Sequence, residues 1–353
     1  MNEILSTLRR IQSDTTLKNY LVAKVIPVEI DEKLEDLNVK GAWNAHESTR
    51  NKFIKVRKAE TIPSEIQGPS YLDLKIKITQ EMLKDCIFCE GRCGANRLEG
   101  EKGYCLVPAA AHVSSAFLHH GEETPIVPSG TIFFSGCNFK CVYCQNDDIS
   151  TSATRGQVAS PNDLASMAKR LYNNGAKNIN YVGGDPTPNL HVILESLRFQ
   201  ELLIAQLWNS NFYNSIEAIN LLLDVMDIWL PDFKYGNNDC AKRLSGITAY
   251  WETLTRNLKH VHDEMVARRW ASLIIRHLVL PDHVECCSIP ILDWIGNNLP
   301  NAMVNIMGQY RPHHMVRRHP EKYKEITRRP SREEMMRVRA YADSININYK
   351  PVS

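Results

Sequence analysis

The sequence lacks any long apolar run and carries almost no excess of one charge. No stretch approaches the ~18 apolar residues that a membrane helix needs, so we expect no membrane contact. Lys and Arg number 42 against 40 Asp and Glu, and the resulting charge of +2 gives no overall attraction to nucleic acid. The first residues also lack the basic and apolar segments of a secretory signal. We therefore expect a folded cytoplasmic protein.

Cysteine is the residue type that stands out. Seven of the ten cysteines form two short clusters: Cys86, Cys89, Cys93 and Cys105, then Cys137, Cys141 and Cys144. In a cytoplasmic chain, closely spaced thiols stay reduced and bind metal more often than they form disulfides. The other three, Cys240, Cys286 and Cys287, lie outside the clusters. We interpret them as small buried apolar side chains.

From about residue 130 onward, short β-type runs alternate with helical patterns. The expected strands are residues 130–136, 177–183, 202–209, 226–233, 272–280 and 302–309. Ser160, Pro161 and Asp163 predict the start of the first intervening helix, and Asn174 with Gly175 predicts its end. Six such units in series predict an α/β fold, a partial (βα)6 barrel.

The chain divides into four expected parts. Residues 1–84 form an N-terminal extension to which we assign no chemistry, and residues 85–125 form a Cys-rich metal-binding segment. Residues 126–310 form the barrel core, and residues 311–353 form a basic C-terminal tail. The basic residues of this tail indicate either a solvated helical face or a docking surface for an acidic partner.

Polar residues gather where the expected strands end. The carboxyl ends of parallel strands share one rim, where βα barrels bind ligands and carry out their chemistry. The residues that we expect at this rim are Gly183, Gly184, Asp185, Asn209, Asn211, Asp232, Lys234 and Arg276, together with Cys137 to Cys144.

The cysteine cluster at this rim supplies three thiolates within eight residues. Three ligands are one short of the four that a structural zinc ion takes. A [4Fe-4S] cluster held by three cysteines would keep one iron open for another ligand. A zinc ion completed by a distant histidine, or three buried cysteines without a metal, are the alternatives.

Two motifs make this segment resemble the radical S-adenosylmethionine (radical SAM) superfamily. The chain reads Cys137-Asn-Phe-Lys-Cys141-Val-Tyr-Cys144, which matches the family pattern Cys-x3-Cys-x-aromatic-Cys. The family's Gly-Gly-Glu-Pro-type turn is similar to Gly183-Gly184-Asp185-Pro186, with Asp in place of Glu. The resemblance implies a partial barrel of radical SAM type.

The resemblance also implies cofactors and their ligands. Cys137, Cys141 and Cys144 would hold a [4Fe-4S] cluster whose fourth iron binds SAM, and an electron donor of flavodoxin or ferredoxin type would reduce it. The cluster would then cleave SAM to methionine and a 5'-deoxyadenosyl radical. The residues expected to contact SAM are Tyr143, Gly183, Gly184, Asp185, Asn209, Asn211 and Arg276, with Arg276 pairing the SAM carboxylate in bidentate fashion.

Further motifs are similar to the branch related to pyruvate formate-lyase activating enzyme, the PflX-type proteins. These motifs include Trp-Asn-Ser-Asn-Phe-Tyr from Trp208 and Trp-Leu-Pro-Asp-Phe-Lys-Tyr-Gly from Trp229. Sugar epimerases are among the relatives of this branch, so the resemblance fixes the cofactor chemistry better than the substrate.

The upstream cysteines make a complete set of four. Cys86, Cys89, Cys93 and Cys105 would suit zinc or a second [4Fe-4S] cluster equally well by ligand count. Zinc would only stabilise the fold, whereas a second cluster would provide an electron path.

The sequence is compatible with three functions. The first is hydrogen abstraction from a small-molecule or sugar substrate, leading to epimerisation, oxidation or rearrangement. An epimerase needs a thiol as hydrogen donor, and Cys240 is the candidate. The second is a glycyl-radical-enzyme activase that acts on a protein partner. The third is a metal-stabilised scaffold or nucleic-acid-binding module, which would leave the polar residues of the rim without a role.

Overall fold

A curved sheet dominates the computed structural model, which describes residues 2–59 and 67–352. In this part of the chain the sheet has eight strands in the order β3-β1-β2-β4-β5-β6-β7-β8. All six expected strands are confirmed and run parallel: β2 (Ser129–Phe134), β4 (Asn178–Gly183), β5 (Ala205–Ser210), β6 (Ile228–Pro231), β7 (Ser272–Leu278) and β8 (Met303–Met307). Each parallel strand lies beside the next one in the sequence, as in a partial (βα)6 barrel.

Two further strands extend the sheet at the β2 edge. β1 (Ala111–His119) pairs antiparallel with β2, and β3 (Gln157–Ala159) pairs antiparallel with β1. Neither strand is among the six that the sequence pattern predicts.

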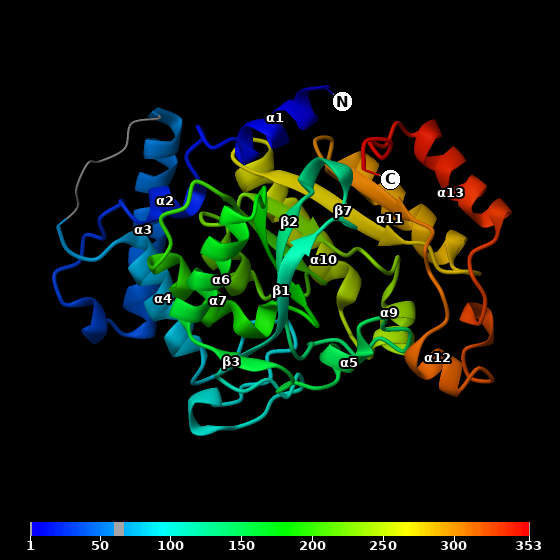
Figure 1. Cartoon of the computed structure of the whole chain (residues 1–353), viewed down its shortest axis with the longest axis horizontal. Helices are drawn as coiled ribbons and strands as arrows, with labels where there is room; N and C mark the ends of the chain where they lie inside the picture. Colours follow the sequence, from blue (N-terminus) through cyan, green and yellow to red (C-terminus); the bar gives the residue numbers. More distant parts are fainter. Residues whose placement is uncertain (1, 60–66, 353) are drawn as a thin grey trace.

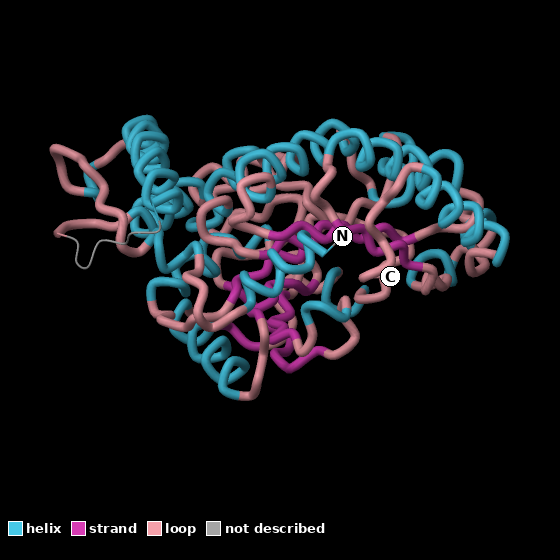
Figure 2. Tube along the Cα trace, turned by 90° about the horizontal axis from the view of Figure 1, so that it is seen from above, coloured by secondary structure: helices cyan, strands magenta, loops and turns pink. Residues whose placement is uncertain are grey.

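Helices follow the parallel strands and cover the outside of the sheet (Figures 1 and 2). The helix start at Ser160 is confirmed, because the Ser160 and Asp163 side chains form a reciprocal capping box before α6. The helices of the barrel are α5 (Asp147–Ser150), α6 (Pro161–Asn173), α7 (Leu190–Arg198), α8 (Ile216–Leu222), α9 (Asn238–Ser245), α10 (Tyr250–Val261) and α11 (Ile289–Asn298).

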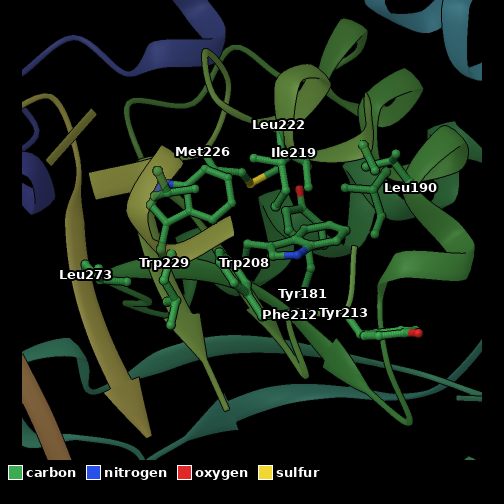
Figure 3. Close-up of a cluster of buried hydrophobic side chains, with 14 of the residues drawn as sticks. Tyr181, Leu190, Trp208, Phe212, Tyr213, Ile219, Leu222, Met226, Trp229 and Leu273 are labelled. Carbon is green, nitrogen blue, oxygen red and sulfur yellow. The ribbon is translucent and has the colours of Figure 1, made fainter. Parts of the chain in front are cut away.

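Large apolar side chains fill the space between the sheet and its helices. Figure 3 shows Trp208 of β5 and Trp229 of β6 packed with Met226 and Leu222. Both tryptophans are fully buried. Successive strand residues point to opposite faces, so the residues beside these tryptophans face the other side of the sheet.

That other side holds a second apolar cluster. Leu207, Ile228 and Ile274 contribute to it from the strands. Leu8 of α1 (Asn2–Gln12) and Val352 complete it. Segments from near both ends of the chain are thus packed into one core.

The remaining helices flank the barrel. In the N-terminal extension, α2 (Asn19–Ala23) and α3 (Val39–Ala59) precede α4 (Tyr71–Met82), which packs between α3 and α7. The segment expected as a basic tail contains α12 (His314–Arg318) and α13 (Arg332–Ser344). It is packed onto the fold through the buried Val316 and Val338. In the described ranges, no helix has the length and apolar character to cross a membrane.

Candidate active site

The loop that carries Cys137, Cys141 and Cys144 follows β2 at the carboxyl end of the sheet. Each thiol has a polar neighbour. The backbone N–H of Phe139 donates to Cys137 Sγ over 3.3 Å, Ser245 Oγ lies 2.9 Å from Cys141 Sγ, and Ser150 Oγ lies 3.3 Å from Cys144 Sγ. Donors at these distances stabilise thiolate ligands.

Burial keeps the thiols of Cys137 and Cys141 protonated when no metal is bound. It raises the pKa of Cys137 well above the usual thiol value and raises that of Cys141 to about 11. A metal ion or cluster would displace the protons, because only the thiolate is a ligand. Three soft ligands on one loop, each beside an N–H or O–H group, fit a [4Fe-4S] cluster with one open iron.

The Gly183-Gly184 turn packs directly under this loop. Gly183 has a φ of +134°, and a Cβ there would lie 2.1 Å from the carbonyl oxygen of Phe134. A Cβ on Gly184 would lie 2.0 Å from the carbonyl oxygen of Gly136. Only glycine therefore allows this close approach. The contact of Gly184 with Gly136 sets the position of the residue that precedes Cys137.

Asp185 uses both carboxylate oxygens to hold backbone. Oδ1 accepts from the N–H of Thr187 over 2.9 Å, and Oδ2 accepts from the N–H of Asn211 over 2.8 Å. Burial raises the pKa of Asp185 to about 6. Asn211 in turn donates through Nδ2 to Asn138 Oδ1 over 2.6 Å, beside Cys137. These two predicted site residues thus support the cysteine loop, and a contact of either with SAM stays a prediction.

Arg276 has protein carboxylates as its partners. It forms two bonds to Glu123, of 2.8 and 2.9 Å, and an ion pair with Glu122. The sequence predicts the SAM carboxylate as the bidentate partner of Arg276, whereas the structure gives it these two glutamates. Burial lowers the pKa of Arg276 to about 10.

Asn209 has one amide hydrogen-bonding group with no protein partner. Its Oδ1 accepts from Arg276 Nη1 over 3.4 Å, while the buried Nδ2 has no hydrogen-bond partner among the described residues. An unpaired buried donor is costly, so Nδ2 is suited to a bound molecule.

Tyr143 is part of the cysteine loop, and its hydroxyl belongs to a chain of hydroxyl groups. Its hydroxyl is 2.7 Å from that of Tyr235, which is 2.6 Å from Ser245 Oγ. The Tyr143 ring also packs edge-on against Tyr310 at 5.7 Å. Since Ser245 contacts Cys141, these hydroxyls link Tyr143 to the Cys141 thiol.

Asp232 and Lys234 form an ion pair of 2.7 Å at the same rim. Burial opposes the charge on Lys234, but the neighbouring Asp232 and the Cys141 thiol outweigh it and raise the lysine pKa. The charge of Lys234 near the cysteine loop is thus balanced by Asp232.

The C-terminal segment covers one side of the loop. His313 Nδ1 lies 3.0 Å from the carbonyl oxygen of Cys144, and the N–H of Val316 donates to the carbonyl of Val142 over 3.1 Å. No sequence signal pointed to this cover, because it joins residues far apart in the chain.

The upstream cysteines surround a cavity of about 170 Å³. Cys86, Cys89, Cys93 and Cys105 all line it, and so does Asn138. Asn138 follows Cys137 directly, so the wall of this cavity is part of the cysteine loop. The four predicted ligands are thus brought together next to the rim.

Cys240 belongs to a different group of side chains. It lies in the first turn of α9, and its Sγ is 3.6 Å from His283 Nδ1 and 3.9 Å from Cys286 Sγ. Cys286 is exposed, so the interpretation of these cysteines as buried apolar side chains is wrong for it. The hydrogen-donor role of Cys240 stays a prediction.

Three cysteine side chains on one loop at the carboxyl rim of a parallel partial barrel are the arrangement expected of an iron-sulfur enzyme. Residues 131–295 match the model of the Radical SAM superfamily. The chain is also 39% identical over 344 residues to an uncharacterized protein, MJ0674, of Methanocaldococcus jannaschii, with 96% of each chain covered. The chain therefore contains a Radical SAM domain and is a radical SAM enzyme, with a [4Fe-4S] cluster and SAM as its cofactors.

Two solved structures of Streptococcus suis SuiB are also similar. The form bound to the precursor peptide SuiA matches at a TM-score of 0.45 and 13% identity, over 87% of this chain and 62% of SuiB. The form bound to S-adenosylmethionine matches at a TM-score of 0.45 and 12% identity, over 88% and 62%. The chain thus spans less than two thirds of the length of SuiB.

Proposed function

We propose that Cys137, Cys141 and Cys144 hold the cluster at which SAM is reductively cleaved, and that the substrate is a small molecule or a sugar. When bound and reduced, the cluster and SAM supply a 5'-deoxyadenosyl radical that abstracts hydrogen. One observation carries this proposal: each of the three thiols lies beside a polar group, which is the N–H of Phe139, the hydroxyl of Ser245 or the hydroxyl of Ser150.

The SAM site would lie between the cysteine loop and the end of β5. Asn209 Nδ2 is the group that we assign to SAM, because it is buried without a protein partner. Arg276 holds the Asn209 amide through Oδ1 and so orients Nδ2. Asp185 and Asn211 would fix the loop geometry, since their polar groups already bind backbone and Asn138.

The covered site favours a small substrate. The Cys-rich segment packs on one side of the cysteine loop and the C-terminal segment packs on another. A reactive radical requires such enclosure, because it would otherwise abstract hydrogen from the wrong partner. A small molecule enters a covered rim more readily than a loop of a large protein does.

The reaction outcome follows from what quenches the substrate radical. If a thiol donated a hydrogen atom to that radical, the product would be an epimer, and Cys240 could be this donor only as a free thiol that binds no metal. Without a donor, oxidation or rearrangement would result. The resemblance of the motifs from Trp208 and Trp229 to the PflX-type branch, which has sugar epimerases among its relatives, supports this substrate class.

The upstream cysteines would hold a second [4Fe-4S] cluster rather than zinc. They line a cavity of about 170 Å³. Among the described residues, only Cys240, His283, Cys286 and Cys287 have all their ligand atoms within 4.8 Å of one another, as one small ion requires. The wider upstream set suits a cluster, in which each thiolate binds a different iron. Electrons from a flavodoxin or ferredoxin would then pass beside Asn138 to the SAM-binding cluster.

The test is anaerobic reconstitution with iron and sulfide, followed by iron analysis and a SAM-cleavage assay with dithionite. The proposal expects about eight irons per chain in the wild type and about four in Cys137→Ala and in Cys93→Ser. Only Cys137→Ala should abolish formation of 5'-deoxyadenosine with dithionite. Iron that is unchanged by Cys137→Ala would overturn the proposal.

The competing function is an activase whose substrate is a partner protein. A glycyl-radical-enzyme activase would cleave SAM about once per partner glycine, without a small-molecule product. Repeated turnover with a sugar or another small metabolite, and no partner present, would contradict the activase alternative.

A further inference from the structure

A third group of metal-binding side chains lies outside the two cysteine clusters. Cys240, His283, Cys286 and Cys287 place one ligand atom each within 4.8 Å of all the others. Cys240 comes from α9, after β6, and the other three come from the turn His283–Ser288 that follows β7. The site therefore joins two neighbouring βα connections.

The spacing of the four ligand atoms matches one tetrahedral ion. With Zn–S near 2.3 Å and Zn–N near 2.0 Å, a tetrahedron places two sulfurs ~3.8 Å apart and a sulfur and a nitrogen ~3.5 Å apart. Cys286 Sγ lies 3.8 Å from Cys287 Sγ and 3.9 Å from Cys240 Sγ. His283 Nδ1 lies 3.6, 3.3 and 3.9 Å from the sulfurs of Cys240, Cys286 and Cys287.

The surrounding backbone holds these ligands in place. Asn237 Oδ1 accepts from the N–H of Cys240 over 2.8 Å, and its Nδ2 donates to the carbonyl of Cys286 over 2.9 Å. Gly236 approaches so closely that a Cβ there would lie 2.7 Å from the Cys286 carbonyl oxygen. His283 and Cys287 are buried, while Cys286 is exposed, which gives an ion a route from solvent.

We propose that Cys240, His283, Cys286 and Cys287 bind one zinc ion in a closed Cys3His site. Three thiolates and an imidazole are a donor set that structural zinc sites use. A cubane cluster does not fit here, because its thiolates bind different irons and stand further apart than these sulfurs do. On binding, the ion displaces the thiol protons to solvent and no electron is transferred.

The zinc ion would position a helix that contacts the iron-sulfur loop. α9 begins near Cys240 and ends at Ser245, whose hydroxyl lies 2.9 Å from Cys141 Sγ. Its last residues also accept backbone hydrogen bonds from Lys140 and Val142 of the loop. An ion at the first turn of α9 thus fixes the helix that supports a cluster ligand at its last turn.

Metal analysis of the full-length purified protein tests the site, with Cys286→Ser and Cys93→Ser as a matched pair of exposed cysteine variants. We expect about one zinc per chain in the wild type. Cys286→Ser should lose it and keep its iron, whereas Cys93→Ser should keep the zinc. Wild-type protein without zinc after growth in zinc-supplemented medium, or zinc retained by Cys286→Ser and lost from Cys93→Ser, would overturn the proposal.

Cobalt gives a second measurement that does not depend on the serine variant. Co²⁺ added to wild-type protein stripped by a chelator should produce the visible absorption of a tetrahedral thiolate site. His283→Cys should keep this site and shift the absorption to longer wavelength, because a fourth sulfur replaces the nitrogen. Octahedral, weakly absorbing Co²⁺ in the wild type would contradict the assignment.

Discussion

Gly183→Ala tests the inference that the Gly-Gly turn supports the cysteine loop by close packing. Gly183 has a φ of +134°, and an added Cβ would lie 2.1 Å from Phe134 O and 2.3 Å from Phe134 N. Gly175 is the matched control, because its φ is +94° and an added Cβ meets nothing within 4 Å. Backbone strain should cost each variant roughly 1 kcal/mol of unfolding free energy.

Only Gly183→Ala adds a clash with strand backbone, which should cost about 2 kcal/mol more. We therefore expect a loss of about 1 kcal/mol for Gly175→Ala and about 3 kcal/mol for Gly183→Ala in urea unfolding at equal slope. Gly183→Ala should also bind less iron after reconstitution, since β2 leads into the cysteine loop. Equal unfolding free energies and equal iron contents in the two variants would refute the packing argument.

Three other predictions concern single side chains. Ser245→Ala removes the hydroxyl beside Cys141 and should lower the reduction potential of the cluster by roughly 40 mV, seen in a potentiometric titration monitored by EPR; an unchanged potential would contradict it. Asn209→Ala should weaken SAM binding about tenfold at unchanged iron content, measured by equilibrium dialysis, and unaltered binding would count against the assigned contact. Arg328 lowers the pKa of Glu334 to about 2, so Glu334 stabilises the fold above its unfolded pKa near 4.5 and ceases to do so as pH falls toward 2. The difference in melting temperature between wild type and Glu334→Gln should therefore shrink as pH falls from 7 to 3, and a constant difference would refute this role.

The parallel strands were predictable because buried parallel strands are nearly continuous apolar runs. β1, which lies between the edge strand β3 and β2, was not, because its residues alternate between buried, half-buried and exposed positions. The start of α6 was predictable because Ser160 and Asp163 cap it locally. Local patterns thus give the barrel and leave its antiparallel edge unassigned.

The same limit applies to the site. The spacing of Cys137, Cys141 and Cys144 is local and points directly to a cluster. The partners of Arg276 lie more than 150 positions away in the sequence, so only the fold reveals that Glu122 and Glu123 hold it. His283 stands three residues before Cys286, and that spacing was the local signal for the third metal group. That spacing accounts for only part of the group, because Cys240 reaches His283 and Cys286 only through the packing of α9.

The apolar cluster that contains both Leu8 and Val352 has a consequence for how the protein is made. These residues are separated by almost the whole described chain, so this core cannot close until Val352 has been synthesised. Until then, the inner faces of β5 to β7 stay exposed to solvent or to a chaperone. We expect nascent chains to remain protease-sensitive until Val352 has left the ribosome and packed against these strands.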